Sequence, residues 1–379
     1  MNGLYIHIPF CKQACSYCEF YFSTRKQLKQ PFVDALVDEI LFYRETDYSA
    51  PIYNTLYIGG GTPSLLNETQ LNAIFSALHH VFKLELDEVT MELNPDDVTS
   101  SYLKLLQKIG INRVSMGVQS FQPELLAFMH RAHSREEALL ALQTIRDTGF
   151  PTFTADLIYG NPGQSLKMLE DDIETLLSFD PPHISAYSLT IEPETRLGKQ
   201  VKLGRIQPPD DDHVSDHIDL VTSLFSEAGL HRYEVSNYAK PGKEALHNSN
   251  YWNHHNYLGF GPSAHSFWKD KKQARRWNNQ PDLKYYLSEK PKAYRIEEEE
   301  LDASVLAEER IMLGLRTKWG VSFPELENEY NYQLSNDQKG WIEKQKNEKL
   351  LTFENGILKL TDSGLKISDL LTVDILSKK

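Results

Sequence analysis

Short runs of β-branched and aliphatic residues alternate with amphipathic stretches through the first 230 residues of the chain. In each amphipathic stretch apolar residues recur every three or four positions, which is the spacing of one helix face. The pattern predicts strands at residues 4–8, 55–58, 88–93, 113–118, 152–158 and 184–189. It predicts a helix after each strand, around residues 32–41, 71–82, 103–109, 139–145, 169–177 and 218–225.

This alternation of strand and helix indicates an α/β fold. Strand–helix units in succession form a parallel sheet with right-handed crossovers. A closed barrel of this kind has eight units, and the chain has six. We therefore expect an open, partial (β/α)6 barrel over residues 1–236. A doubly wound open sheet is the alternative that the pattern leaves open.

The alternation stops near residue 237. Residues 237–300 are rich in Asn, His, Trp and Tyr and end in a run of glutamates, which predicts an irregular extension and a linker. Residues 301–379 predict helices followed by a hairpin with a tight turn at Asn355-Gly356. This order predicts a small winged-helix-like α+β domain at the C-terminus. Such modules often bind DNA, but the lack of a basic helix favours a packing or partner role.

The composition narrows the class of protein. The formal net charge of -13 argues against a general nucleic-acid-binding protein, which needs a basic surface. No apolar run reaches the roughly 18 residues expected of a membrane-spanning helix. The N-terminal segment has neither a basic region nor a cleavage site, so we expect no signal peptide. A cytoplasmic protein is the expectation.

The three cysteines of the chain, Cys11, Cys15 and Cys18, follow the first predicted strand directly. In a reducing compartment, clustered cysteines are more often metal ligands or redox groups than disulfides. A [4Fe–4S] cluster normally takes four thiolates, so three would leave one iron open to a molecule with amine and carboxylate groups. S-adenosylmethionine (SAM) carries both groups. The CxxxCxxC spacing therefore predicts a SAM-binding [4Fe–4S] cluster.

A zinc ion is the alternative occupant of these cysteines, with a histidine such as His7 as a further ligand. Zinc motifs usually supply their ligands as two spaced pairs. The chain has no second pair of cysteines. The spacing therefore favours the cluster.

Glycine-rich or polar residues follow the carboxyl ends of the next predicted strands. The run GGGTP lies at 59–63, and Glu92, Gln119 and Asp156 lie near the ends of later strands. Barrel enzymes bind their ligands at this end, and glycines let backbone N–H groups approach a ligand closely. Each residue alone would fit a cap or a turn. Together they predict a binding site beside the cysteines.

The same motifs, with others, suggest a family. They are YIHIPFC at 5–11, GGGTP at 59–63, ELNP at 92–95, GVQSF at 117–121, DLIYG at 156–160 and YLGFGPSA at 257–264. With them the chain resembles the radical SAM family that contains oxygen-independent coproporphyrinogen III dehydrogenase and the HemW-type heme chaperones. The resemblance covers most of the chain, including the C-terminal unit, and implies a radical SAM barrel.

The resemblance implies a role for each matching residue. Cys11, Cys15 and Cys18 would hold the cluster. The SAM bound to the cluster would contact Tyr5, Gly60 and Glu92. The dehydrogenase also accommodates a second SAM, and the residues that match its surroundings are Tyr17, Gly61, Thr62, Gln119, Arg131, Asp156 and Thr190.

Three features favour the chaperone branch of this family. Phe20 stands where the dehydrogenase pattern CxxxCxxCxC has a further cysteine. Only ten residues precede Cys11, where the dehydrogenases carry a long extension. Finally, the segment HNSNYW at 247–252 matches the HNxxYW signature of the heme chaperones.

An imidazole is a common axial ligand of heme iron, so the resemblance implies that His247 binds heme. The aromatic residues around it could cover a flat macrocycle. A histidine that is simply packed among aromatic side chains is the alternative interpretation. The rival ligands nearby in the sequence are His254, His255 and His265.

The sequence thus leads to the hypothesis of a heme chaperone that transfers heme to acceptor hemoproteins, with respiratory enzymes at the membrane among them. We expect a cytoplasmic protein with transient encounters at the inner membrane face, able to form a homodimer. The alternative is the dehydrogenase activity, the radical oxidative decarboxylation of coproporphyrinogen III to protoporphyrinogen IX. A nucleic-acid-modifying radical SAM enzyme is a third class, which the acidic composition disfavours.

Overall fold

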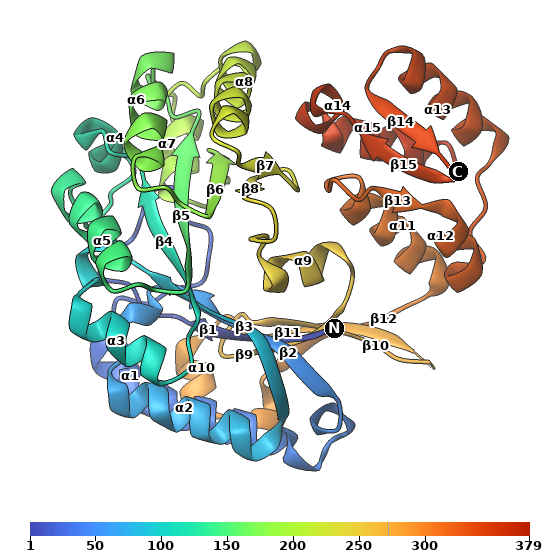
Figure 1. Cartoon of the computed structure of the whole chain (residues 1–379). Helices are drawn as coiled ribbons and strands as arrows, with labels where there is room; N and C mark the ends of the chain where they lie inside the picture. Colours follow the sequence, from blue (N-terminus) through green and yellow to red (C-terminus); the bar gives the residue numbers. More distant parts are fainter. Residues whose placement is uncertain (272) are drawn as a thin grey trace.

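The computed structural model describes residues 1–271 and 273–379. Six parallel strands form the centre of a large curved sheet, in the order β1-β2-β3-β4-β5-β6 (Figure 1). They are β1 (Asn2–Ile8), β2 (Ile52–Gly60), β3 (Lys83–Leu93), β4 (Arg113–Gln119), β5 (Thr152–Tyr159) and β6 (His183–Ser188). The six strands predicted from the sequence are confirmed, and with them the α/β fold.

Helices cover the outer face of this sheet (Figure 1). They are α1 (Lys29–Phe42), α2 (Glu68–Val81), α3 (Ser100–Lys108), α5 (Arg135–Asp147), α6 (Leu166–Leu177) and α8 (Asp211–Glu227). Two shorter helices, α4 (Pro123–Phe128) and α7 (Arg196–Lys202), lie instead against the loop after β1, where Ser16 is hydrogen-bonded to Met129 and Leu197. Short 3-10 turns lie at Lys26–Leu28, Tyr43–Glu45, Asp47–Ser49, Pro63–Leu65, Pro95–Asp97 and Pro291–Ala293. Capping boxes at Asn67 and Ser134 start α2 and α5.

Alternating residues of the central strands face the two sides of the sheet. In β1 the side chains of Leu4, Ile6 and Ile8 are fully buried in the main hydrophobic core. Tyr5 and His7 between them line an inner cavity. Because the helices cover one face and the other encloses a cavity, the architecture is a partial barrel and not a doubly wound sheet.

The structure corrects the expectation that residues 237–300 are irregular, because this segment extends the sheet beyond β1. Its elements are β8 (Asn237–Ala239), α9 (Leu246–Trp252), β9 (Asn256–Phe260), β10 (His265–Lys269), β11 (Ala274–Asn279), α10 (Leu283–Ser288) and β12 (Arg295–Leu301), after the short β7 (His231–Arg232). Strand β9 pairs parallel to β1, whereas β10, β11 and β12 continue the sheet antiparallel. On the other side of the barrel, β8 and β7 follow β6.

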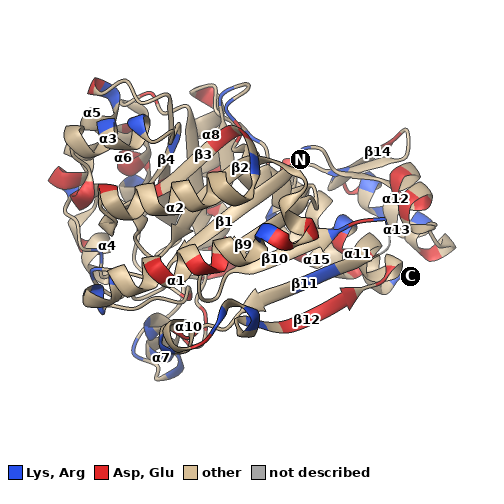
Figure 2. Cartoon of the chain, turned by 90° about the horizontal axis from the view of Figure 1, so that it is seen from below, with Lys and Arg blue, Asp and Glu red and all other residues tan. Residues whose placement is uncertain are grey.

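Charged residues in β11 and β12 make these outer strands difficult to recognise from the hydrophobicity pattern. Arg275 pairs with Glu298 and Arg276 with Glu299 across β11 and β12. Figure 2 shows the two strands as neighbouring stripes of opposite charge. Strands paired through such side chains lack the apolar alternation by which strands are predicted.

Besides the pairing of β9 with β1, a buried carboxylate attaches this extension to the barrel. Glu39 of α1 accepts hydrogen bonds from the Gly261 N–H at 2.8 Å, Asn279 Nδ2 at 2.6 Å and the Tyr286 hydroxyl at 2.6 Å. Its side chain is buried, which raises its pKa, and the three donors oppose that shift. Glu39 thus joins α1 to the β9–β10 turn, to β11 and to α10.

The C-terminal segment folds around a hydrophobic core of its own. Its elements are α11 (Ala303–Gly314), β13 (Val321–Ser322), α12 (Phe323–Tyr330), α13 (Asn336–Asn347), β14 (Leu351–Glu354), β15 (Ile357–Leu360), α14 (Asp362–Lys366) and α15 (Ser368–Ser377). The strands form a small antiparallel sheet in the order β13-β15-β14. Asn355 and Gly356, both with positive φ, make the predicted tight turn. The domain boundaries at residues 236 and 300 stay predictions.

The C-terminal unit contacts the segment that carries α9. Arg310 Nη1 donates to the carbonyl of Trp252 at 2.9 Å, and Glu309 lies 3.0 Å from His254 Nε2. Backbone hydrogen bonds also join Val235 to Arg316. Within the described residues, no helix combines the length and the apolar character needed to cross a membrane.

We predict that Glu39→Ala lowers the free energy of unfolding by about 3 kcal/mol, because it leaves three buried donors without an acceptor. Urea denaturation followed by circular dichroism measures this change. Asp38→Ala, at the exposed neighbouring position, is the matched control and should change stability by less than about 0.5 kcal/mol. Equal stability of the two variants would contradict the role of Glu39.

Candidate functional site

The inner face of the partial barrel encloses a cavity of about 1110 Å³. Strands β1 to β6, the loop after β1 and helix α9 all contribute to its wall. Every residue that the resemblance assigns to the cluster, to SAM or to heme lines this cavity: Tyr5, Cys11, Cys15, Tyr17, Cys18, Gly60, Gly61, Thr62, Glu92, Gln119, Arg131, Asp156, Thr190 and His247. The structure therefore brings the whole predicted set together.

The cysteine loop is tied to the barrel on several sides. Lys12 Nζ lies 2.6 Å from Asp96 and 2.5 Å from Asp97, in the loop after β3. The N–H of Cys11 donates to Ser23, and that of Ser16 donates to the carbonyl of Met129, each at 3.1 Å. These contacts fix the backbone of the loop while its three thiols remain partly accessible.

The thiols form one group, because each lies close enough to influence the others electrostatically. Burial raises the pKa of Cys11 to about 12 and that of Cys18 to about 11. Within residues 1–271 and 273–379, no three His, Cys, Asp or Glu side chains converge as ligands of a single metal ion. This donor set could hold an iron–sulfur cluster with one open iron, and it fits a mononuclear zinc site poorly.

Glycines at the end of β2 make room for the side chains of Glu92 and His7. A Cβ on Gly59 would lie 2.8 Å from Glu92 Oε1, and one on Gly60, whose φ is +105°, would lie 2.5 Å from the His7 ring. Glu92 Oε1 accepts from the Tyr57 hydroxyl at 2.8 Å, and Oε2 accepts from the Gly60 N–H at 3.1 Å. Burial raises the pKa of Glu92 to about 7, with the Tyr57 hydrogen bond opposing and Asp156 adding to the shift.

Asp156 and Arg131 both line the cavity, and the guanidinium lies close enough to oppose the raised pKa of Asp156. Ser115 Oγ donates to Asp156 Oδ1 at 3.3 Å, and burial raises the pKa of Asp156 to about 6. The guanidinium of Arg131 donates to Asn94 Oδ1 at 3.0 Å and approaches Cys15 Sγ at 3.5 Å. Arg131 therefore lies beside the cysteine loop.

Four buried polar atoms of this wall have no hydrogen-bond partner among the described residues: Thr90 Oγ1, Gln119 Oε1, Arg131 Nε and His183 Nδ1. A polar ligand could satisfy them. Gln119 has a positive φ of 66°, a strained conformation that is common at binding sites. The residues present thus fit the amine, carboxylate and hydroxyl groups of SAM.

His247 lies at the opposite end of the cavity from the cysteines, where α9 packs against β1 and β2. Only 1% of its surface is exposed. Its Nδ1 is hydrogen-bonded to Thr55 at 2.9 Å and its Nε2 to the Tyr251 hydroxyl at 2.8 Å, and its ring stacks on Tyr57. Burial lowers its pKa to about 3. The imidazole is neutral, but both of its nitrogens are engaged.

The sequence analysis missed several polar residues of the inner wall. They are Tyr57, Thr90, Arg113, Ser115, Thr154, His183, Ser185 and Tyr187. Arg113 and Ser115 are two residues apart on β4, and Thr154 and Asp156 are two residues apart on β5. This period of two is the signal that could have found them, because alternate strand residues face the same side of a sheet.

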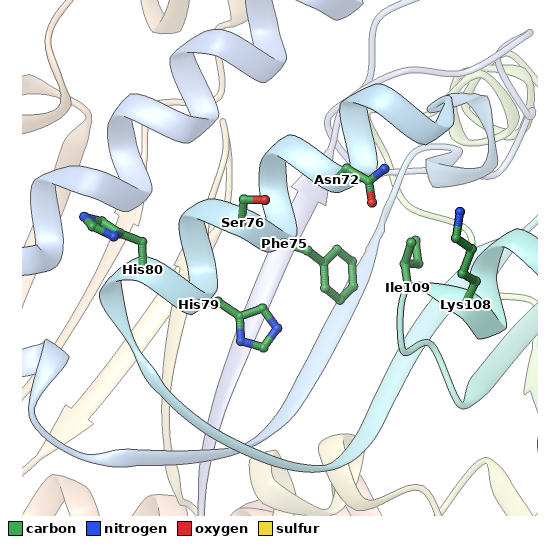
Figure 3. Close-up of a pocket in the computed structure, with 7 residues that line it drawn as sticks. All are labelled: Asn72, Phe75, Ser76, His79, His80, Lys108 and Ile109. Atoms are coloured by element: carbon green, nitrogen blue, oxygen red, sulfur yellow. The ribbon is translucent and has the colours of Figure 1, made fainter.

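A second hollow, an open groove of about 610 Å³, lies between α2 and α3 on the outer face. Figure 3 shows Phe75 and Asn72 on one side of it and Lys108 and Ile109 on the other, with His80 apart from them. None of the predicted site residues lies in this groove. The barrel cavity is therefore the candidate site.

Sequence comparisons identify the family. Residues 5–176 match the profile of the Radical SAM superfamily, and residues 301–367 match the HemN C-terminal domain. The chain is 36% identical over 341 residues to the Bacillus subtilis protein named heme chaperone HemW, which covers 88% of each chain. The Lactococcus lactis protein of the same name is 33% identical over 369 residues, covering 97% of this chain and 95% of the relative. The chain belongs to the HemW family of radical SAM proteins.

The fold of this HemW-family chain also has a solved counterpart. The structure titled "Coproporphyrinogen III oxidase (HemN) from Escherichia coli is a Radical SAM enzyme" superposes with a TM-score of 0.85 at 21% identity. The match covers 99% of this chain and 89% of that one. It confirms the radical SAM barrel with its C-terminal unit, and at this identity it bears on the fold alone.

The raised pKa of Glu92 predicts a pH dependence. Between its ordinary pKa of 4.5 and its folded value of about 7, the folded state binds more protons than the unfolded state. The free energy of unfolding should therefore fall as the pH rises through this window, by about 1 kcal/mol per pH unit from this group. Denaturation of wild type and Glu92→Gln across the window measures the difference. Parallel pH profiles would contradict it.

Proposed function

We propose that this chain is a heme chaperone that binds heme in the barrel cavity and transfers it to acceptor hemoproteins. The observation that carries the proposal is the cavity of about 1110 Å³, which joins three cysteines, a SAM-type polar wall and aromatic side chains in one space. Its size lies at the upper end for small-molecule and cofactor sites. Membership of the HemW family supports the same function.

The cofactors follow from the residues that line the cavity. Cys11, Cys15 and Cys18 would hold a [4Fe–4S] cluster, and Tyr5, Gly60 and Glu92 would contact SAM. A second SAM would lie near the residues Tyr17, Gly61, Thr62, Gln119, Arg131, Asp156 and Thr190. When bound and reduced, such a cluster supplies the electron that cleaves SAM to a radical. The protein's own contribution is to hold the loop, orient SAM and enclose both.

Aromatic residues offer the apolar surface that a macrocycle needs. Tyr5, Tyr57, Tyr251 and Tyr257 line the cavity, and Phe20, 67% exposed, lies where it opens. His247, the ligand expected from the HNxxYW segment, stays a prediction. Its Nε2 would have to give up the hydrogen bond to Tyr251 before it could reach iron.

The remaining parts of the proposal concern partners and location. We propose hemoprotein acceptors, including respiratory enzymes reached at the inner membrane face, for a cytoplasmic protein that can form a homodimer. Nucleic acid is not among the proposed partners, because the net charge is -13.

Heme titration of the cluster-reconstituted protein under anaerobic conditions tests the function. We expect a saturable Soret change at one heme per chain, followed by heme transfer to apomyoglobin as a model acceptor. Wild-type protein should form no porphyrinogen product from coproporphyrinogen III in the presence of SAM and a reductant. Turnover of coproporphyrinogen III would contradict the chaperone-only function and establish the dehydrogenase alternative.

The cluster has its own test. Cys11→Ala, Cys15→Ala and Cys18→Ala should each lose most of the bound iron and sulfide after reconstitution, because three thiolates are the minimum set for this cluster. Gln13→Ala, in the same loop and exposed, is the control and should retain both. Full iron loading of any cysteine variant would contradict the ligand assignment.

A further inference from the structure

Most histidines near the cavity already have hydrogen-bond partners. His7 is bonded to the Tyr5 hydroxyl at 3.0 Å and to the Tyr21 carbonyl at 2.8 Å. His183, which is 1% exposed, is bonded through Nε2 to Tyr233 at 2.8 Å, and its Nδ1 is buried in the wall without a partner among the described residues. His247 has both nitrogens engaged, as described above. For each of these rings, binding iron would require breaking a buried hydrogen bond or opening the wall.

The rival histidines beyond α9 are engaged as well. His254 pairs with Glu309 at 3.0 Å and stacks on Phe267. His255 Nδ1 is bonded to Asn250 Oδ1 at 3.3 Å. Neither ring lines the cavity.

His265 differs from all of these. It is the first residue of β10, its side chain is exposed, and it lines the cavity. Within the part of the chain that the structure describes, neither of its ring nitrogens has a hydrogen-bond partner. Partial burial and Arg276 lower its pKa below 6.5, while Glu297 opposes the shift. The ring is therefore neutral near neutral pH and offers a free lone pair.

The backbone that carries His265 is fixed, although its side chain is free. Gly261, with a φ of +94°, lies so close to β1 that a Cβ there would be 2.5 Å from the His7 carbonyl oxygen. The N–H of Gly261 donates to Glu39, and the N–H of Ser263 donates to the Asn279 carbonyl at 3.1 Å. Strand β10 then pairs His265 with Asn278. This turn holds the imidazole beside His7, near the cysteine end of the cavity.

We propose that His265 is the protein ligand of the heme iron, an inference that rests on the proposed function. A neutral imidazole nitrogen donates its lone pair to the iron, and a water or other weak axial ligand leaves. No electron is transferred and no proton is exchanged. On delivery, a ligand of the acceptor replaces the imidazole, and His265 returns to its free form.

The position of His265 suits a protein that must release its cargo. A ligand at the exposed edge of the cavity lets an incoming acceptor approach the iron and exchange one imidazole for another. A ligand as deeply buried as His247 would hold the iron behind the barrel wall. The exposed residues Glu19 and Phe20 line the same cavity, so the heme would bind between the cysteine loop and the β9–β10 turn.

Heme titrations of four variants, His265→Ala, His265→Gly, His247→Ala and His231→Ala, test this assignment. His231 is exposed on β7 and does not line the cavity, so it serves as the matched control. We expect His265→Ala to weaken heme binding at least about tenfold and to shift the Soret band. His247→Ala and His231→Ala should keep the wild-type band position.

Added imidazole should restore the wild-type Soret position in His265→Gly and leave the wild type unchanged, a result that a merely structural role would not produce. A wild-type band in His265→Ala, or a shift confined to His247→Ala, would overturn the assignment while heme binding, and with it the proposed function, stands. Absence of saturable heme binding by the wild type would overturn both. Circular dichroism and cluster content check that each variant is folded.

Discussion

The buried carboxylate of Glu39 is the contact on which the geometry of the cavity depends. The barrel strands are held by ordinary parallel pairing and a shared apolar core. The strands beyond β1 continue the sheet from the β9–β1 pairing, and the outermost pair, β11 and β12, carries charged side chains. Glu39 fixes them by accepting from the Gly261 backbone, from Asn279 and from Tyr286. A buried carboxylate is stable only when its hydrogen bonds are satisfied. The three hydrogen bonds to Glu39 are therefore expected to form or to be lost together.

The two faces of the barrel sheet differ in polarity: the outer face is apolar and the inner face is polar. Outward-facing residues such as Ile6 and Val114 are fully buried against the helices, while their neighbours on the strands carry hydroxyl, carboxyl and guanidinium groups into the cavity. Tyr57 joins the two ends of this interior, since its hydroxyl bonds Glu92 and its ring stacks on His247. One side chain thus contacts both the Glu92 carboxylate and the imidazole at α9.

The sequence reveals much of this fold and part of the site. The central strands are predictable because β-branched runs and amphipathic helices alternate there. The clustering of Cys11, Glu92 and Asp156 is predictable because parallel strands bring their carboxyl ends to one edge. Strands β11 and β12 are not predictable from hydrophobicity, since pairs such as Arg275 with Glu298 stabilise them.

The hydrogen bonds of individual side chains are the least predictable part. The HNSNYW segment marks His247 in the sequence, but no pattern shows that Thr55 and Tyr251 occupy its two nitrogens. They come from β2 and from the next turn of α9, and only the packing of that helix against the barrel brings them together. Arg131 is a similar case. The resemblance assigns it to a SAM-binding position, but only the fold shows that its guanidinium lies against Cys15.

The acidic strand β12 has a consequence for how copies of the chain can associate. It ends the large sheet, so among the residues that the structure describes no strand pairs with its outer side. Its four consecutive glutamates, at residues 297–300, are all exposed. Two such edges brought together in a continuous intermolecular sheet would set like charges opposite one another, which destabilises strand pairing. The charges of β12 thereby oppose edge-to-edge pairing of two copies through this strand.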